Sequence, residues 1–322
     1  MPELPEVETI ARGLARRVSG DVIESIWLGR KPEPLKSSAQ EIAATLEHSR
    51  IATVRRMGKH IVFDLEQNDV ARAPLRQAQG RLSPSKSQHS NARAGSRAKP
   101  SRPLLTAHAE ADEGVRPTQP GPVQAQWIVH LGMTGRLQVC EAQEDILKHT
   151  HAILKLASGK ELRFVDPRRF GRLSVARAGG FEAGGIEPLE ADLDRFVALI
   201  RGRKTPIKSA LLNQKLLRGV GNIYADESLF RAGIRPRRRA STITRDQLSK
   251  LLVSVKEVLQ EAIALGGSSI SDYVDADGEA GFFQLQHRVY GREGEPCLVC
   301  KTPIKRIVIA GRSSHYCPKC QK

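Results

Sequence analysis

The sequence contains no run of about 18 apolar residues, the length that a helix needs to cross a bilayer, so we expect no membrane partner. Its first residues include glutamates where a signal peptide would have basic and then apolar residues, and we therefore expect a cytoplasmic protein. Acidic residues are in deficit, because 51 Lys and Arg face 35 Asp and Glu and leave a net charge of +16. Nucleic acid is the best-fitting partner, since each phosphate that a cation neutralises releases condensed counterions. From charge alone, a merely soluble basic protein remains the alternative.

One long segment lacks the residues that build a core. Residues 67–124 contain no Ile, Phe, Tyr, Trp or Met, and carry nine Lys and Arg against four Asp and Glu. Such a composition cannot bury enough apolar surface to order itself, so we predict a disordered insertion in a connection between strands. Its basic excess could add loose affinity for DNA, although a passive insert is the simpler interpretation.

A chain of 322 residues can bury at least one core, and its length predicts about two domains. In the N-terminal half, Val7, Ile10, Leu14 and Val18 recur at helical spacing and predict an amphipathic helix over residues 3–18. Alternating apolar residues then predict strands. The strand ranges are 22–28, 51–65, 126–139, 151–156 and 162–165. This half is therefore predicted to be a helix plus a β-sandwich.

After Pro188 the pattern is helical. Helices are predicted over residues 191–200, 206–214, 222–232 and 244–265, the last beginning with the capping box Thr244-x-x-Gln247. The glycine-rich turn at residues 218–221 places free N–H groups at the start of the helix at Asn222, where a phosphate would fit. The alternative is an ordinary turn with Asn222 as the N-cap.

The cysteines predict a metal site. Cys297-x-x-Cys300 and Cys317-x-x-Cys320 are separated by sixteen residues, which is the spacing of a zinc site with four thiolates. Four protein ligands leave no open position for water, so this one Zn²⁺ is expected to be structural. The residues between the pairs read as a hairpin, with Arg312 at its turn. Cys140 is left over and is interpreted as a buried thiol.

Six motifs occur in one order and carry a resemblance to a known family. They are PELPEVET at 2–9, HLGMTG at 130–135, DPRRFG at 166–171, GVGNIYADESLF at 219–230, VYGREGEPC at 289–297 and the final CxxC pairs. Together they resemble formamidopyrimidine-DNA glycosylase over nearly the whole chain except the insertion. The resemblance implies an α+β multidomain fold. Its parts would be a catalytic β-sandwich domain at 2–187, a helix-two-turn-helix domain at 188–267, a lesion-covering loop at 268–284 and a zinc finger at 285–322.

The resemblance also assigns roles to residues at the N-terminus. Once Met1 is removed, Pro2 would attack the sugar C1′, expel the damaged base and form a Schiff base that permits β- and δ-elimination. An α-amine has a pKa of about 7.7–8.0, so part of it is neutral and nucleophilic at physiological pH. Glu3 would transfer protons, and Lys59 and Arg312 would contact phosphate and assist elimination. Glu6 either orients the site or favours the helix N-terminus.

Further residues are expected to hold DNA. Extruding a base leaves a hole that apolar or planar side chains fill, and the resemblance gives this wedge to Met133, Arg168 and Phe170. Asp166 is expected to fix their loop rather than to catalyse. The expected phosphate contacts are His149, Arg203, Asn222 and Arg312, with Lys208 as a weaker suggestion and with His151 beside His149 as a competitor.

The leading hypothesis is a bifunctional DNA glycosylase and abasic-site lyase of base excision repair. It would act as a monomer on double-stranded DNA that contains oxidised purines, namely formamidopyrimidines and 8-oxoguanine, and would need only the structural zinc. The alternative within the family is an endonuclease VIII-like enzyme for oxidised pyrimidines. A different class, a zinc-finger DNA-binding protein without catalysis, predicts that the duplex stays intact.

Overall fold

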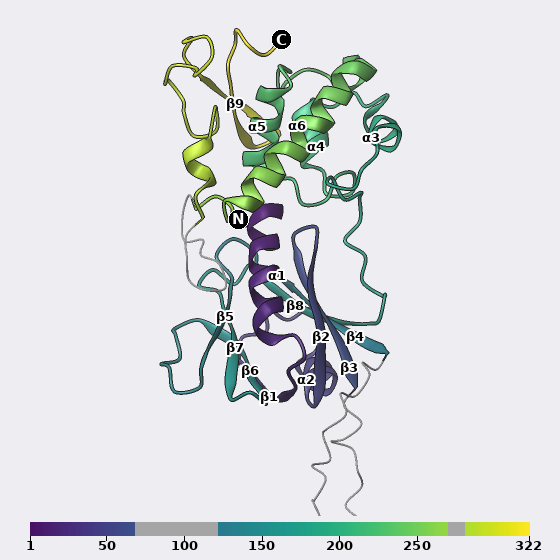
Figure 1. Ribbon diagram of the computed structural model, residues 1–322, viewed down its shortest axis with the longest axis vertical. Helices are drawn as coiled ribbons and strands as arrows, with labels where there is room; N and C mark the ends of the chain where they lie inside the picture. The colour runs from purple at the N-terminus through teal and green to yellow at the C-terminus, as the bar shows by residue number, and fades with distance from the viewer. Residues whose placement is uncertain (68–121, 270–280) are drawn as a thin grey trace, which may run out of the picture. The chain divides into compact units, whose positions relative to one another are not determined.

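The computed structural model describes residues 1–67, 122–269 and 281–322 (Figure 1). Most of the insertion at 67–124 and of the loop at 268–284 therefore lies outside the described residues. The insertion joins neighbouring strands as predicted, because β3 (His60–Gln67) pairs antiparallel with β4 (Val123–His130). In the described part of the chain, each helix is too short or too polar to cross a membrane.

Two antiparallel sheets of four strands form the N-terminal sandwich. The first sheet has the order β1 (Ile23–Leu28), β6 (Thr150–Leu156), β7 (Lys160–Val165) and β5 (Arg136–Glu141). The second has the order β2 (Ser49–Met57), β3, β4 and β8 (Arg172–Arg177). Inward-facing side chains of both sheets, among them Phe63, Trp127 and Phe164, form one buried core, as the alternating pattern predicted.

Helix α1 (Leu4–Val18) belongs to two cores. Val7, Ile10, Leu14 and Val18 pack into the core of the sandwich, whereas Leu4 is fully buried in the core of the helical region. Figure 1 shows α1 in purple beside strand β2, with its N-terminal end at helix α6 (Arg245–Ala264), and residue contacts link α1 to both. The first turn of α1 is thereby fixed where sandwich and helices meet.

The second half is helical, as predicted. Its elements are α3 (Leu193–Ile200), α4 (Ile207–Leu212), α5 (Asn222–Arg231), the 3₁₀ turn Ala240–Thr242, α6 and the 3₁₀ turn Phe283–Gln286. The capping box of α6 is confirmed, since Thr244 and Gln247 exchange side-chain and backbone hydrogen bonds. The N-cap of α5 is Gly221, so the alternative that Asn222 caps this helix is wrong.

The C-terminal region is the predicted hairpin of β9 (Lys305–Ile309) and β10 (Arg312–Tyr316). Its two turn residues, Ala310 and Gly311, have φ of 47° and 73°, the left-handed backbone of the tight turns that suit twisted strands. A small core of its own includes Cys297, Ile304 and Cys317 together with Phe230 of α5. The α+β multidomain fold class is thus confirmed.

Two elements were missed, and two apolar runs were read as too long. Helix α2 (Ala39–Leu46) buries only Ile42 and Leu46, and strand β8 directly follows the DPRRFG loop, so neither stands out in the pattern. The run at 51–65 is divided between β2 and β3, and the run at 126–139 between β4 and β5. Periodicity does not show where a chain reverses direction without a strong turn signal.

Candidate active site

One cavity of about 840 Å³ gathers residues that are distant in sequence. Its lining includes five of the predicted site residues, Glu3, Lys59, Met133, Asn222 and Arg312, together with Met1. Met1 is half exposed, whereas Pro2 is partly buried and is not among the residues that line the cavity. The chain therefore begins in the cavity that holds the predicted acid and the two predicted cations.

Glu3 is the buried acid of this cavity. It is 5% exposed, and its Oε1 accepts a hydrogen bond of 3.3 Å from the backbone N–H of Ile223 in the first turn of α5. Its Oε2 is buried and accepts no hydrogen bond from the described residues. Burial raises the pKa of Glu3 above its ordinary value, against the attraction of Lys59. The carboxyl group is thus held where it can carry a proton at higher pH than usual.

The glycine-rich turn allows this close approach. A Cβ on Gly221 would lie 2.2 Å from the Cδ of Glu3, and a Cβ on Gly219 would lie 2.8 Å from Leu4. The N–H of Leu4 also donates to the carbonyl of Gly219 at 3.0 Å. The predicted phosphate site at the start of α5 is therefore occupied at Ile223 by a carboxylate of the same chain, which satisfies the helix end in the same way.

Glu6 performs both functions that were left open for it. Its Oε2 accepts from the backbone N–H of Glu3 at 2.8 Å and so caps α1. Its Oε1 accepts from the hydroxyl of Tyr224 and, at 2.8 Å, from the N–H of Ser268. With 2% exposure, this one carboxylate ties the start of α1 to α5 and to the chain that follows α6.

Lys59 lies in the turn between β2 and β3 and is 7% exposed. Burial lowers its pKa, the carboxylates of Glu3 and Glu6 raise it, and the charge of Arg312 lowers it further. The charges of Glu3, Glu6 and Arg312 are thus near enough to change the pKa of Lys59. A buried amine with a lowered pKa beside a buried acid with a raised one is typical of a catalytic site.

A buried ion cluster positions the turn that carries Lys59. Arg56, on β2, makes two hydrogen bonds to Glu187 at 2.9 and 3.0 Å and one to Glu8 of α1 at 2.7 Å. Arg218 donates to the same Glu187 at 3.2 Å. Because Arg56 is paired on both sides, the strand end, α1 and the glycine-rich turn are fixed relative to each other.

Two histidines of the cavity were not recognised in the sequence. His60 and His130 face each other across β3 and β4, with ring centroids 5.0 Å apart. Burial lowers the pKa of His130 to about 4, helped by the charges of His60 and Lys59, and burial also lowers that of His60. Both rings are neutral at physiological pH. The sequence feature that could have identified them is their position, since His60 follows Lys59 and His130 begins the motif HLGMTG.

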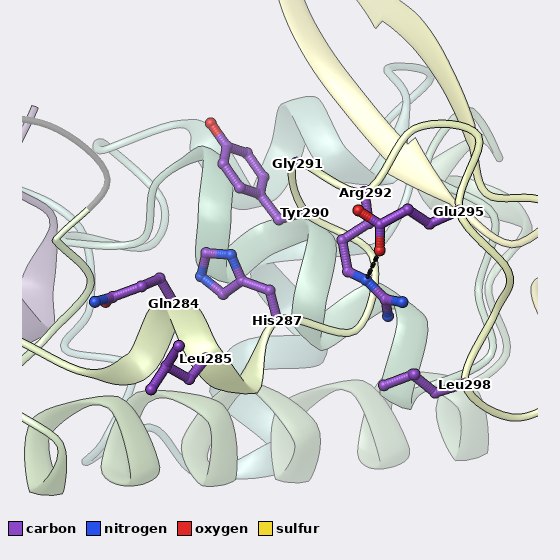
Figure 2. A pocket seen from close by; sticks show the side chains of 8 residues that line it. All are labelled: Gln284, Leu285, His287, Tyr290, Gly291, Arg292, Glu295 and Leu298. Carbon is purple, nitrogen blue, oxygen red and sulfur yellow. Dashed lines mark hydrogen bonds and ion pairs between the residues drawn. The ribbon is translucent and has the colours of Figure 1, made fainter.

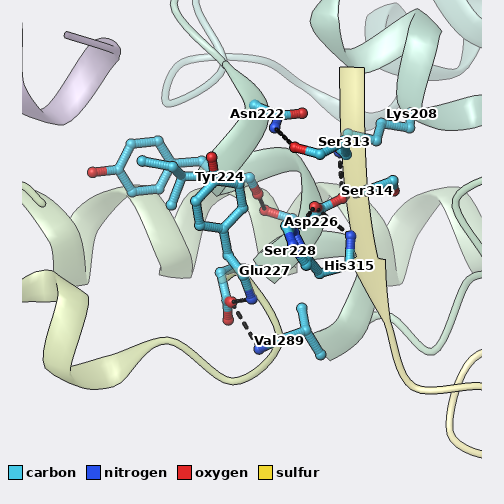
Figure 3. Close-up of polar contacts among 12 residues, drawn as sticks. Lys208, Asn222, Tyr224, Asp226, Glu227, Ser228, Val289, Ser313, Ser314 and His315 are labelled. Carbon is cyan, nitrogen blue, oxygen red and sulfur yellow. Dashed lines mark hydrogen bonds and ion pairs between the residues drawn. The ribbon is translucent and has the colours of Figure 1, made fainter. Parts of the chain in front are cut away.

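Arg312 is exposed at the start of β10, and a buried polar network holds its strand (Figure 3). Asp226 of α5 accepts from the hydroxyl of Ser314 at 3.0 Å and from the N–H of His315 at 2.8 Å. Asn222 donates from its side-chain amide to the hydroxyl of Ser313 at 3.2 Å. The carboxylate of Asp226 therefore fixes the position of the strand whose first residue, Arg312, lines the cavity.

The weaker suggestion that Lys208 contacts phosphate is wrong in this structure. Its side chain is fully buried, and its Nζ forms an ion pair with Asp226 at 2.7 Å and donates to the carbonyl of Ser313 at 2.6 Å (Figure 3). A basic residue in a basic protein reads as a surface group, and its burial is decided by the packing of α4 against α5 and β10. Lys208 thus supports the hairpin instead.

The four cysteines form a metal site. Their Sγ atoms all lie within 4.8 Å of one another, with Cys297 and Cys320 at 3.9 Å and Cys300 and Cys317 at 3.4 Å. Tetrahedral zinc with bonds of about 2.3 Å needs sulfur atoms about 3.8 Å apart, so the donor set fits one structural Zn²⁺. Cys140, in contrast to the prediction, is only half-buried.

The predicted wedge residues lie on two loops that pack together. Met133 is 42% exposed and Phe170 is 46% exposed, and the guanidinium of Arg168 lies 4.9 Å from the ring of Phe170. Asp166 is fully buried and fixes the loop, as expected, by accepting from the hydroxyl of Thr134 at 2.6 Å and from the N–H of Gly171 at 2.7 Å. Met133 thus lies exposed in the main cavity, whereas Phe170 does not line that cavity and is exposed on the loop that the buried carboxylate fixes.

The remaining predicted phosphate contacts are scattered. His149 is exposed and lines a different cleft, whereas His151 is buried and its ring bonds the carbonyl of Asp166, so His149 is the accessible one of the two. Arg203, beyond α3, donates to the carbonyl of Leu199 at 2.5 Å. These two positions are not brought to the cavity that holds Glu3 and Lys59.

A third hollow of about 520 Å³ lies at residues 284–298 (Figure 2). His287 and Tyr290 line it, and Arg292 pairs with Glu295 at 2.8 Å at its edge. Glu227 of α5 holds this segment by accepting from the N–H groups of three consecutive residues, 288–290. None of the predicted site residues lines this hollow, but Tyr290 also lines the main cavity.

Comparison with known proteins covers the same regions. Residues 1–173 match the formamidopyrimidine-DNA glycosylase N-terminal domain, residues 185–274 the H2TH domain of the same enzyme, and residues 294–322 a zinc finger found in FPG and IleRS. Proteins named formamidopyrimidine-DNA glycosylase from Solibacter usitatus and Desulfitobacterium hafniense are 40% and 36% identical, with full coverage of both chains.

Solved structures agree with these matches. The Lactococcus lactis Fpg in complex with DNA containing an abasic site superimposes with a TM-score of 0.77 at 29% identity, over 99% of each chain. The MutM (Fpg) protein from Thermus thermophilus gives a TM-score of 0.73 at 34% identity, over 99% of this chain and 98% of that one.

Proposed function

Because the chain belongs to the formamidopyrimidine-DNA glycosylase family, we propose that it removes oxidised purines from double-stranded DNA and then cleaves the strand at the abasic site. The observation that carries this proposal is the single cavity in which the N-terminus, Glu3, Lys59 and Arg312 meet. These residues come from α1, the β2–β3 turn and the zinc hairpin, and they meet only in the folded chain.

Pro2 is the proposed nucleophile. After removal of Met1, its secondary amine attacks C1′ of the damaged nucleotide, a carbon–nitrogen bond to the sugar forms, and the bond to the base breaks as the base leaves with a proton. The sugar ring opens and an iminium ion forms on the nitrogen of Pro2. Loss of a proton from C2′ then expels the 3′ phosphate, and a second elimination expels the 5′ phosphate.

Glu3 is the proposed proton carrier for these steps. Its raised pKa lets it keep a proton at higher pH than an ordinary glutamate, so it can donate to the ring oxygen as the sugar opens and take the proton back afterwards. Its anchored Oε1 leaves Oε2 for the substrate. Lys59 and Arg312 supply positive charge to the phosphates that leave, and Lys59 does so from a buried position where that charge acts strongly.

The DNA contacts are proposed from exposure and position. Met133, Arg168 and Phe170 fill the space of the extruded nucleotide, with Arg168 facing the base left without a partner, and Asn222, Arg203 and His149 contact phosphates. The structural zinc keeps the hairpin of Arg312 folded. We also propose that the protein is a monomer and is cytoplasmic.

The decisive experiment is borohydride trapping on an oligonucleotide with one 8-oxoguanine opposite cytosine. Protein with a free Pro2 should form a covalent adduct, and Pro2→Gly should lose most of it. The matched control is the same protein with an N-terminal tag first retained and then cleaved to leave Pro2. Equal trapping with and without the tag would overturn the assigned nucleophile, and preferred cleavage of thymine glycol would favour the endonuclease VIII-like alternative.

A further inference from the structure

A separate cleft of about 380 Å³ lies on the outer face of the sheet β1-β6-β7-β5, and Trp27 forms part of it. Ile26 and Leu28 pack against the sandwich core, so Trp27 between them points to the opposite face. Its partner across the strands is Ile153, which is buried but lies outside the core cluster. Trp27 nevertheless remains 50% exposed, an unusual exposure for the largest side chain.

Positive charge surrounds this indole. The cations Arg30, Lys31 and Arg169 line the cleft beside His149, and no acidic residue occurs among the described residues that line it. Glu33 pairs with Arg169 at 3.0 Å, but both side chains are exposed and the pair is weak. A flat aromatic face among cations is the combination with which proteins bind single-stranded nucleic acid, since bases stack on the ring and phosphates bind the charges.

The backbone of the cleft is held in an uncommon conformation at two places. His149 and Arg169 have φ of 71° and 56°, in the left-handed region that side chains other than glycine rarely adopt. Both are tied to Asp166, whose N–H donates to the carbonyl of His149 at 3.0 Å and whose carbonyl accepts from the N–H of Arg169 at 3.3 Å. The same buried residue thus fixes two loop residues of the cleft in this conformation.

The cleft shares a loop with the wedge. In the segment 166–171, Pro167 and Arg169 line the cleft, whereas Arg168 lies over Phe170. We propose that the cleft binds an unpaired nucleotide of DNA next to the wedge, with its base stacked on Trp27 and its phosphate held by the surrounding cations. This inference rests on the proposed function, because a wedge that opens the duplex supplies unpaired nucleotides beside it.

The chain offers a direct test, because Trp27 and the fully buried Trp127 are its only tryptophans. A short single-stranded oligonucleotide, and a duplex with a non-cleavable abasic analogue, are titrated into the protein while tryptophan emission is recorded. Both should quench the emission of Trp27. Trp27→Leu should abolish the quenching and weaken binding of the single strand about tenfold, whereas Trp27→Phe, which keeps an aromatic face, should bind nearly as well as the wild type.

Controls separate stacking from charge and from misfolding. In Trp27→Leu the emission of Trp127 reports that the sandwich core is intact. Inorganic polyphosphate should compete weakly and leave Trp27 unquenched, and equal quenching by polyphosphate would overturn a base site. Arg30→Ala should reduce the salt dependence of binding by about one phosphate contact, whereas Lys155→Ala, at an exposed position of β6 that does not line the cleft, should not.

Cleavage of an 8-oxoguanine duplex is measured on the same samples. Unchanged Trp27 emission at saturating DNA, or wild-type affinity of Trp27→Leu, would refute the nucleotide site even if the duplex is cleaved. Absence of both cleavage and the borohydride adduct would instead refute the proposed function.

Discussion

Gly221→Ala tests whether the position of Glu3 controls turnover. Gly221 has φ of −129° and ψ of −160°, an extended backbone that any residue adopts, so alanine adds no backbone strain. Its Cβ, however, would lie 2.2, 2.4 and 2.5 Å from the Cδ and the two oxygens of Glu3. Ordinary carbon contacts are about 3.5 Å or longer, so the carboxyl group must retreat by about 1 Å. A displacement of that size costs roughly 100-fold in rate, or about 2.7 kcal/mol of transition-state stabilisation.

The assay is single-turnover nicking of an 8-oxoguanine duplex, with DNA affinity measured separately. Alanine is also a poorer N-cap than glycine, and this alone costs up to about 1 kcal/mol of stability. Gly221→Ser is the matched control, because serine restores the cap but carries the same Cβ. Both variants should bind DNA and nick it about 100-fold more slowly. If either variant nicks at the wild-type rate, the reasoning from the contact between Gly221 and Glu3 is refuted.

Three further predictions concern charge and metal. Because burial lowers the pKa of Lys59, kcat/KM should fall as pH rises through that lowered value, and Lys59→Arg should move this fall to higher pH in a pH–rate profile. Asp226→Asn removes the anionic partner of the fully buried Lys208 and should lower the free energy of unfolding by about 3–5 kcal/mol. Urea unfolding followed by helical circular dichroism measures this loss, and the second substitution Lys208→Met should restore most of it. An unchanged free energy of unfolding in Asp226→Asn would contradict the network. Removal of zinc by a chelator, or Cys317→Ser, should abolish DNA binding and leave the emission of buried Trp127 unchanged, because the sandwich core is separate from the zinc region.

Local patterns predicted most elements. The spacing of Val7, Ile10, Leu14 and Val18 gave helix α1, and Thr244 with Gln247 gave the start of α6, because both signals act within one or two helical turns. The spacing of the cysteines gave the metal site for the same reason, since each CxxC pair places two thiolates within one turn of chain.

Local patterns did not predict which charged side chains are buried and which are exposed. Lys59 and Lys208 are buried, and one of them was expected at the surface, because burial depends on which elements pack over a residue. The capture of the α5 N-terminus by Glu3 joins residues 220 positions apart. The periodicity of the sequence does not predict contacts between such distant residues. For the same reason, it did not predict that His60 and His130 line the cavity.

The sequence by itself determined most of the elements, the zinc ligands and the order of the motifs, because these depend on neighbours along the chain. Only the tertiary structure decided that the start of α1 meets α5, that Asp226 holds the strand of Arg312, and that Trp27 stays exposed among cations. The physical reason is that pKa shifts, steric limits at glycine and the accessibility of a side chain arise from contacts between segments distant in sequence, which exist only once the chain has packed.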